Sequence, residues 1–266
     1  MAPARPRLLV DPGREEAELR EYLGDAFDRA KLENHERLLD QEAIRVGDER
    51  SFYRSSEAYL FDLTAFAMTG TKLPYLEMLT DTVPSGARLL DYGCGIGSDG
   101  LMLLEAGYRV EFADFANPST AYLRWRLEKR GLEAPVHDVE GFVPGGFDAA
   151  YAFDVIEHVN DPFGFLGELE SRAAVVEVNF LEYDPNEQYL HHELPIPELL
   201  AHVCHQRLVA YKLLHGTSHV VVYRPEQASA ARQLGNRLAL TLEQRLARLR
   251  TGVPPIRRAD RRGSQP

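Results

Sequence analysis

The sequence predicts an α/β protein built on one doubly wound, mostly parallel β-sheet, with helical additions at both ends. Three observations support this fold class. Short apolar runs alternate with helical patterns along the middle of the chain, which is typical of parallel strands joined by helices. Residues 88–97 have the order strand, glycine-rich loop and start of a helix. Near the C-terminus, two alternating segments flank Leu214-His-Gly-Thr217 and predict an antiparallel hairpin.

Length and composition restrict the class of protein. A chain of 266 residues is long enough for one large domain with a sizeable core. Its net charge of -11 argues against a broad nucleic-acid surface, because phosphate binding needs basic patches. We expect no membrane partner either, since no apolar run is long enough to span a bilayer and the N-terminus is not a signal peptide. The two cysteines, Cys94 and Cys204, suit a reducing cytoplasm.

The helical additions are predicted outside residues 70–225, as an N-terminal lid over 1–69 and a C-terminal helix with a disordered basic tail over 226–266. Helical periodicity covers residues 14–46 and again 51–68. The second region is rich in aromatic residues, which either pack the additions onto the core or line a pocket from above: Phe52, Tyr53, Tyr59, Phe61 and Phe66. The C-terminal helix has a narrow apolar stripe that packs on its own domain or on a second subunit: Leu234, Leu238, Leu242, Leu246 and Leu249.

The core between these additions begins with a helix over residues 70–79. Five predicted parallel strands follow, at residues 88–91, 108–114, 134–138, 145–154 and 173–180. Helices are predicted after the first two strands and from Pro195 onward, since proline suits a first helical turn. The hairpin strands are residues 207–214 and 218–223.

The glycine loop after the first strand predicts a site for a nucleoside cofactor. Gly93, Gly95 and Gly97 follow Asp91, and glycine is needed where backbone turns sharply or approaches a ligand closely. Two cofactor classes compete. Gly95, Gly97 and Gly100, with an acid at Asp114, match the dinucleotide fingerprint. However, Asp91 would place a carboxylate close to a pyrophosphate, whereas a cofactor with a cationic centre and no phosphate tolerates it better.

The segment Asp91-Tyr-Gly-Cys-Gly-Ile-Gly97 resembles motif I of the class I S-adenosylmethionine (SAM)-dependent methyltransferases. A second match is Phe-Asp-x-x-x-x-x-Asp-Val-Ile-Glu-His-Val from Phe147, which is similar to the segment that follows the fourth strand in these enzymes. The resemblance covers about residues 70–224 and implies a seven-stranded sheet. It implies that Lys72 clamps the cofactor's carboxylate, that Asp114 accepts from both ribose hydroxyls and that Phe115 flanks the adenine. The full set of cofactor residues that it implies is Lys72, Asp91, Gly93, Gly95, Gly97, Asp114, Phe115, Asp138, Val139, Phe153 and Asp154.

Methyl transfer from a sulfonium is an in-line displacement, so the protein contributes mainly positioning and, for some acceptors, a general base. Three histidines are the candidates for that base. His158 lies beyond the fourth strand, and His191 and His192 lie after the fifth strand with Glu193 beside them. Tyr53 and Tyr183 are weaker candidates. We predict no metal site, because no His-x-x-x-His or similar spacing is present.

These observations predict a SAM-dependent methyltransferase that modifies an O, N or C atom of a small molecule and releases S-adenosylhomocysteine. Two alternatives remain open from the sequence: an enzyme of the same fold with another reaction, such as a cyclisation or elimination, and a non-catalytic partner subunit. The leucine stripe adds the expectation of a possible homodimer through the C-terminal helix.

Overall fold

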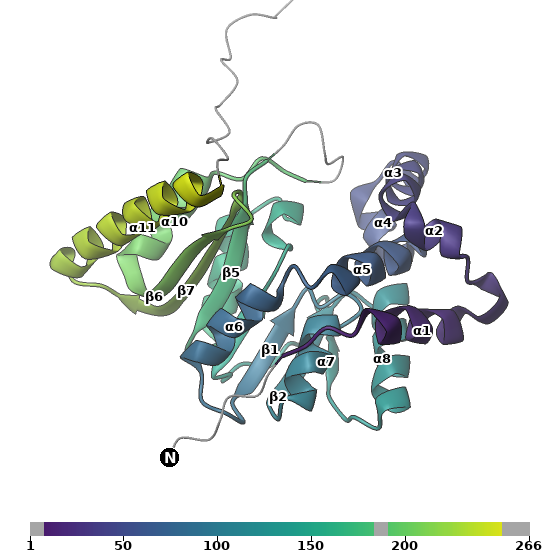
Figure 1. Cartoon of the computed structure of the whole chain (residues 1–266). Helices are drawn as coiled ribbons and strands as arrows, with labels where there is room; N and C mark the ends of the chain where they lie inside the picture. The colour runs from purple at the N-terminus through teal and green to yellow at the C-terminus, as the bar shows by residue number, and fades with distance from the viewer. Residues whose placement is uncertain (1–7, 184–190, 252–266) are drawn as a thin grey trace, which may run out of the picture.

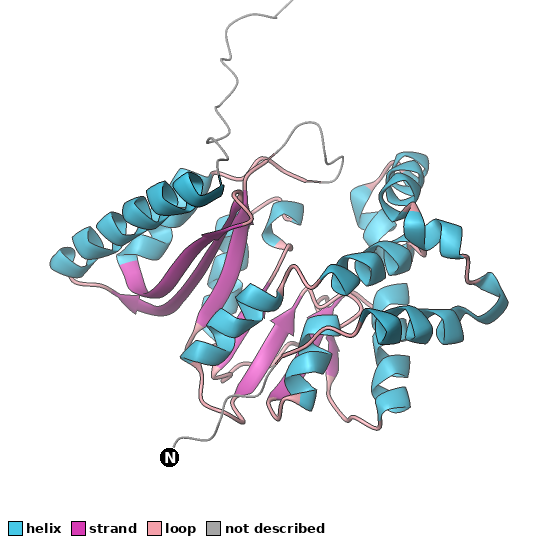
Figure 2. Ribbon diagram, viewed as in Figure 1, coloured by secondary structure: helices cyan, strands magenta, loops and turns pink. Residues whose placement is uncertain are grey.

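The computed structural model describes residues 8–183 and 191–251, and its centre is a seven-stranded sheet in the order β3-β2-β1-β4-β5-β7-β6 (Figures 1 and 2). The strands are β1 (Arg88–Tyr92), β2 (Arg109–Asp114), β3 (Val136–Asp138), β4 (Ala149–Ala152), β5 (Val176–Leu181), β6 (Gln206–Leu214) and β7 (Ser218–Gln227). The first five are parallel to their neighbours, whereas β7 pairs antiparallel with β5 and β6. The predicted sheet and hairpin are therefore confirmed.

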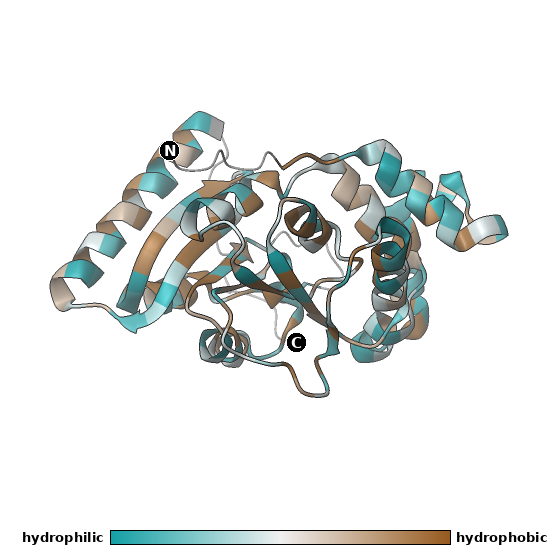
Figure 3. Cartoon of the chain, turned by 90° about the horizontal axis from the view of Figure 1, so that it is seen from below, coloured by the Kyte–Doolittle hydropathy of each residue, from teal (hydrophilic) through white to brown (hydrophobic). Residues whose placement is uncertain are grey.

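Both faces of the sheet are covered by helices, because alternate residues of each strand point to opposite faces. Leu89 belongs to the core that α6 (Leu73–Thr82), α7 (Ser98–Glu105) and α8 (Pro118–Arg130) close. Leu90 belongs to the core on the other face, under α9 (Pro162–Arg172) and α10 (Ile196–His205). The view from below in Figure 3 shows apolar strand segments between these two layers. The arrangement is the doubly wound fold that the alternating pattern predicts.

The helical pattern of residues 14–46 is divided among several helices in the structure. These residues divide into α1 (Pro12–Leu23), the 3₁₀ turn η1 (Gly24–Ala26), α2 (Arg29–Glu33) and α3 (His35–Val46). Gly24 ends α1 with a φ of 54°, a conformation that residues with a Cβ rarely adopt. Asp28 then caps α2 by accepting from the Ala30 N–H. The second helical region likewise divides into α4 (Glu49–Ser55) and α5 (Ala58–Thr69).

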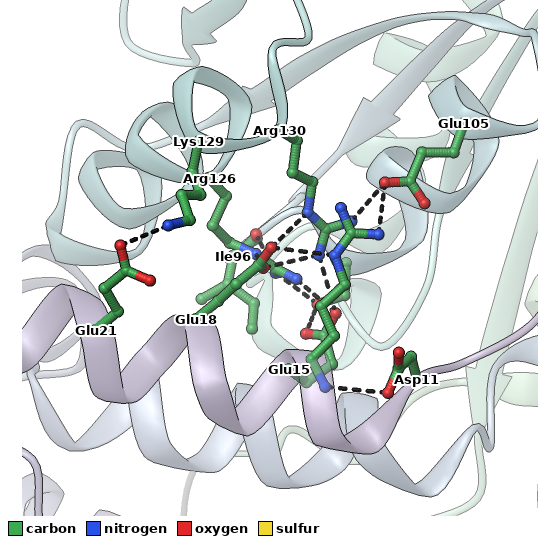
Figure 4. Close-up of polar contacts among 11 residues, drawn as sticks. Asp11, Glu15, Glu18, Glu21, Ile96, Glu105, Arg126, Lys129 and Arg130 are labelled. Atoms are coloured by element: carbon green, nitrogen blue, oxygen red, sulfur yellow. Dashed lines mark hydrogen bonds and ion pairs between the residues drawn. The ribbon is translucent and has the colours of Figure 1, made fainter.

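A buried ion-pair cluster joins α1 to α8 and thereby attaches the N-terminal helices to the core (Figure 4). Arg126 of α8 is fully buried, and it donates to Glu15 at 2.5 Å and to Glu18 at 2.8 Å. Arg130 adds a second contact to Glu18 at 2.7 Å. Arg126 also donates to the Ile96 carbonyl at 3.0 Å. The same guanidinium therefore holds both α1 and the loop that precedes α7.

The C-terminal helix α11 (Ala230–Thr251) packs against its own domain through a face other than the leucine stripe. Leu240 and Ala247 are each 4% exposed, and Leu240 belongs to the core below α10. The five leucines of the stripe point outward, with exposed fractions from 46% to 82%. Residues 252–266, where we predicted a disordered tail, lie outside the described residues. Within the described part of the chain, no helix combines the length and apolar character that crossing a membrane requires.

Candidate active site

One cavity of about 890 Å³ lies between the N-terminal helices and the loops that follow the parallel strands. This is the edge where ligands bind in open α/β sheets. Nine of the predicted site residues line it: Lys72, Gly93, Gly95, Asp114, Phe115, Phe153, Asp154, His158 and His191. The cavity is therefore bounded by the predicted cofactor loop and by two of the three candidate catalytic histidines.

The loop between β1 and α7 has the left-handed backbone that its glycines allow. Gly93, Gly95 and Gly97 have φ values of 76°, 52° and 73°. Side chains also pack directly against them: a Cβ on Gly93 would lie 2.5 Å from Val155, and one on Gly95 would lie 2.8 Å from Leu63 of α5. Glycine is thus required both by the turn and by the close packing of the loop, which leaves its backbone on the cavity wall.

Asp114 ends β2 with its carboxylate fixed by two backbone groups. Its Oδ2 accepts from the Gly95 N–H and its Oδ1 from the Phe115 N–H, both at 2.7 Å. Burial raises the pKa of Asp114 to about 6, although these two hydrogen bonds act in the opposite direction. Each carboxylate oxygen can accept more than one hydrogen bond. The group therefore remains able to accept a pair of hydroxyls from a ligand in the cavity.

Lys72 lies at the start of α6 and faces acidic groups across the cavity. Its Nζ is 3.3 Å from Asp154 and 3.8 Å from Asp99, and it donates to the Phe153 carbonyl at 3.1 Å. Burial lowers the pKa of Lys72, but the neighbouring carboxylates raise it by more, so that the pKa lies above its usual range. The ammonium is consequently charged, and it sits where a ligand's polar end can reach it.

Asp154 follows β4 with a φ of 56°, which is unusual for a residue with a side chain. Asn179 of β5 holds this conformation. Its Oδ1 accepts from the Asp154 N–H at 2.8 Å, and its Nδ2 donates to the Asp154 carboxylate at 2.7 Å. Sequence reasoning did not identify Asn179, because a polar residue inside a strand gives no local signal of its partner.

Five predicted residues do not line the cavity: Asp91, Gly97, Asp138, Val139 and His192. Asp91 pairs with Phe112 and Tyr151 inside the sheet and is 5% exposed. Burial, with Asp99 nearby, raises the pKa of Asp91 to about 8. Asp138 accepts from the Glu140 N–H in its own turn. Direct cofactor contacts by Asp91 and Asp138 therefore stay predictions.

Two of the three candidate histidines, His158 and His191, lie together in the wall of the cavity. His158 lies in the short turn η2 (Ile156–His158), and its Nδ1 is 2.7 Å from the Tyr53 hydroxyl of α4. The rings of His158 and His191 meet edge to face with centroids 4.5 Å apart. Burial, with His158 nearby, lowers the pKa of His191 to about 3. His192 points away and lies 3.4 Å from Glu49, with its side chain 42% exposed.

Some aromatic residues of the N-terminal helices pack in the protein interior, and others line the cavity. Phe52 and Phe61 are buried in the protein interior, with exposed fractions of 0% and 4%. Tyr53, Tyr59 and Phe66 line the cavity. Leu9, Val10 and Asp11, which precede α1, line it as well. The helices before residue 70 thus form a wall of the candidate site.

Comparison with known proteins identifies the family. A family model described as a methyltransferase domain matches residues 67–214, which is more than half of the chain. The chain belongs to this methyltransferase family. The cofactor of the family is SAM, and the cavity fits it: a fixed carboxylate at the tip of β2, a charged lysine and a glycine-lined wall are all present.

Two curated relatives are similar to part of this chain in sequence, and one solved structure is similar to it in fold. The ubiquinone biosynthesis O-methyltransferase of Ruegeria sp. (strain TM1040) is 33% identical over 34% of this chain and 38% of its own length. The cypemycin N-terminal methyltransferase of Streptomyces sp. is 37% identical over 34% of this chain and 35% of its own length. The chain thus spans well under half of these relatives. An O-methyltransferase family protein from Burkholderia thailandensis shares the fold, with a TM-score of 0.52 and 11% identity over 75% of this chain and 72% of that protein.

Proposed function

We propose that this chain transfers the methyl group of SAM to an O, N or C atom of a small molecule that binds in the same cavity. The observation that carries the proposal is the continuity of that cavity. Its wall includes the glycine loop with Asp114, and it also includes His158 and His191, beside which we place the acceptor. A bound SAM supplies an electrophilic methyl group on a sulfonium. The acceptor then forms a bond to the methyl carbon while the carbon–sulfur bond breaks, with its electron pair left on sulfur.

In this proposal the chain's own residues position the two reactants. Asp114 accepts the ribose hydroxyls, and Phe115 beside it flanks the adenine. The amino-acid end of SAM carries an ammonium and a carboxylate, and the paired Asp154 and Lys72 present opposite charges to them at 3.3 Å separation. Asp138 and the Val139 backbone remain the predicted adenine contacts. Side chains that hold SAM in this way lower the entropy cost of aligning its methyl group with the acceptor atom.

The acceptor end contains no strong general base in the proposal. His192 does not line the cavity, so we no longer favour it as the proton acceptor. His191 lines the cavity, but its pKa of about 3 makes the imidazole a weak base. His158 remains the better candidate, because Tyr53 orients its ring. A small, partly aromatic cavity of this size suits a metabolite-sized acceptor.

Two further proposals concern the setting of the enzyme. We propose a cytoplasmic protein, since Cys94 and Cys204 are free thiols. We also propose a homodimer through the exposed leucine stripe of α11. A Cβ added at Gly235, next to Leu234 in this helix, would have no neighbour within 4 Å among the described residues. A glycine inside a helix costs about 1 kcal/mol relative to alanine, and its missing side chain would let a second helix approach closely.

Thermal unfolding with and without ligand tests the proposed cofactor. SAM and S-adenosylhomocysteine should raise the melting temperature by mass action, with a stabilisation of about 2.7 kcal/mol at 100 times the dissociation constant. NAD should have no effect. Stabilisation by NAD and none by SAM would refute the proposal. Incubation with SAM and candidate acceptors tests turnover, because methyl transfer must release S-adenosylhomocysteine in step with methylated product.

A further inference from the structure

Three side chains with metal-ligating atoms meet at the acceptor end of the cavity. Glu157, His158 and His191 each offer one such atom, and these atoms all lie within 4.8 Å of one another. Glu157 and His158 come from the turn η2, whereas His191 comes from the segment after β5. Among the residues that the structure describes, no other group of three meets this condition. No short sequence spacing indicates this group, because the third ligand lies far along the chain.

The carboxylate of Glu157 lacks the partner that its position demands. Its side chain is 1% exposed, and neither carboxylate oxygen has a hydrogen-bond partner among the described residues. A buried carboxylate is costly unless a cation or donors compensate it. Glu177 in β5 is equally buried and also unpartnered, so burial alone does not define a site. Glu157 differs in having two imidazoles beside it.

The two imidazoles are held in place by neighbours on other elements. The Tyr53 hydroxyl contacts Nδ1 of His158 at 2.7 Å, which fixes the ring as outer partners commonly do for metal-binding histidines. The segment that carries His191 is anchored by its neighbour, since the His192 N–H donates to the Glu157 carbonyl at 2.8 Å.

We propose that Glu157, His158 and His191 bind one divalent first-row transition-metal ion, of which Zn²⁺ is the simplest example. Two imidazoles and one carboxylate suit zinc, iron and similar ions, whereas magnesium and calcium prefer oxygen ligands alone. Bonds of about 2.0–2.2 Å place two ligands of one ion at most about 4 Å apart. Small rotations of the three side chains therefore suffice to close the site. Three protein ligands leave an open position, as catalytic zinc sites do.

The open position lies in the same cavity and would accept an oxygen of the acceptor. A bound metal ion lowers the pKa of a coordinated hydroxyl, so the proton leaves to solvent without a strong base. This consequence rests on the proposed methyl transfer, whereas metal binding itself does not. The acceptor class that this site favours is a molecule with a hydroxyl beside a second oxygen, which can chelate the ion.

Metal titration of the whole chain, without a histidine tag and after treatment with a chelator, tests the proposal. Zn²⁺ is followed by calorimetry and Co²⁺ by visible absorption, both in the absence of SAM. We expect one ion per chain. Loss of a residue that only hydrogen-bonds a metal ligand weakens metal binding by about 10–100-fold. The variants Glu157→Gln and His191→Ala remove ligands themselves, so each should weaken metal binding by more than this. The matched controls are Glu177→Gln, a buried unpartnered glutamate elsewhere, and His192→Ala, the adjacent histidine outside the cavity.

The outcomes separate the metal site from the proposed activity. Binding that persists in both Glu157→Gln and His191→Ala would overturn the proposal, as would equal loss in the two controls. A sulfur-to-cobalt charge-transfer band that disappears in Cys94→Ala would also overturn it, because Cys94 lines the same cavity. Thermal unfolding of each variant shows whether it is folded. A wild-type chain that binds SAM but no Zn²⁺ or Co²⁺ refutes the metal site and leaves the proposed methyl transfer standing.

Discussion

At the scale of single residues, the carboxylate of Asp114 both holds the glycine loop and lines the cavity. Its two oxygens accept backbone N–H groups from the glycine loop and from Phe115, so the carboxylate holds the loop while it faces the cavity. Its position was predictable, because β2 is an alternating strand that ends at an acid. The two backbone contacts were not, since they depend on how the loop folds over the strand.

Replacing Asp114 by asparagine should weaken SAM binding without unfolding the chain. Hydrogen bonds to a charged group are worth about 1.5–3 kcal/mol, more than those to a neutral one. We therefore expect the dissociation constant to rise by on the order of tenfold or more, measured by calorimetry. An unchanged dissociation constant would show that Asp114 is not the ribose contact.

The pH dependence of the same binding provides an independent check. The pKa of Asp114 is raised to about 6, and a ligand that donates two hydrogen bonds favours the ionised form. Affinity should consequently fall as the pH decreases through about 6, because protonation removes the charge that the hydroxyls contact. The Asp114→Asn variant should lack this dependence. If both proteins lose affinity in parallel, another group is responsible.

At the scale of elements, the attachment of α1 to α8 decides whether the wall of the cavity is in place. Arg126 and Arg130 contact Glu15 and Glu18 across the two helices (Figure 4). Burial raises the pKa of Glu18, but Arg130 and Arg126 lower it by more, so that the net pKa lies below its usual range. A carboxyl with a lowered pKa stabilises the fold at neutral pH, and that contribution is lost as the pH falls through its folded pKa.

Arg126→Met should destabilise the chain severely. Removing one partner of a buried ion pair typically costs about 3–5 kcal/mol, and Arg126→Met would leave Arg130 as the remaining buried cation beside Glu15 and Glu18. The matched control is Lys129→Met, because Lys129 lies on the same helix and contacts Glu21 of α1 with side chains 44% and 55% exposed. Exposed pairs contribute about 0–1 kcal/mol. Denaturant unfolding measures both, and limited proteolysis shows whether α1 detaches. Equal effects of the two substitutions would contradict the role assigned to Arg126.

At the scale of the whole molecule, α11 presents two faces with different environments. Leu240 and Ala247 pack inward, while the five leucines of the stripe are exposed. The two alternatives that the sequence left open are therefore not exclusive. One face covers the hairpin, and the other remains available for a second copy.

The proposed dimer predicts that paired substitutions in the stripe change the molecular mass in solution. Leu238→Asp combined with Leu242→Asp should shift light scattering from dimer to monomer, because buried carboxylates would oppose the helix contact. Phe142→Asp is the control, since Phe142 is 83% exposed and lies outside the stripe. A wild-type chain that is monomeric at all concentrations would rule the dimer out.

The sequence by itself determined the sheet, the hairpin, the glycine loop and the strand-tip acid Asp114. These features follow from short-range rules: alternation along a strand, periodicity along a helix and the backbone freedom of glycine. The same rules did not locate the helix breaks that depend on capping, as at Gly24 and Asp28. Asp91 pairs inside the sheet and does not reach the cavity.

Only the tertiary structure decided which distant side chains meet. Arg126 and Glu15 are 111 positions apart, and Tyr53 and His158 are 105 apart. Glu157 and His191 come together because η2 follows β4 while His191 follows β5, and parallel neighbours place their following loops at one edge of the sheet. No local pattern encodes such contacts, since they depend on strand order and on the packing of the N-terminal helices over that edge.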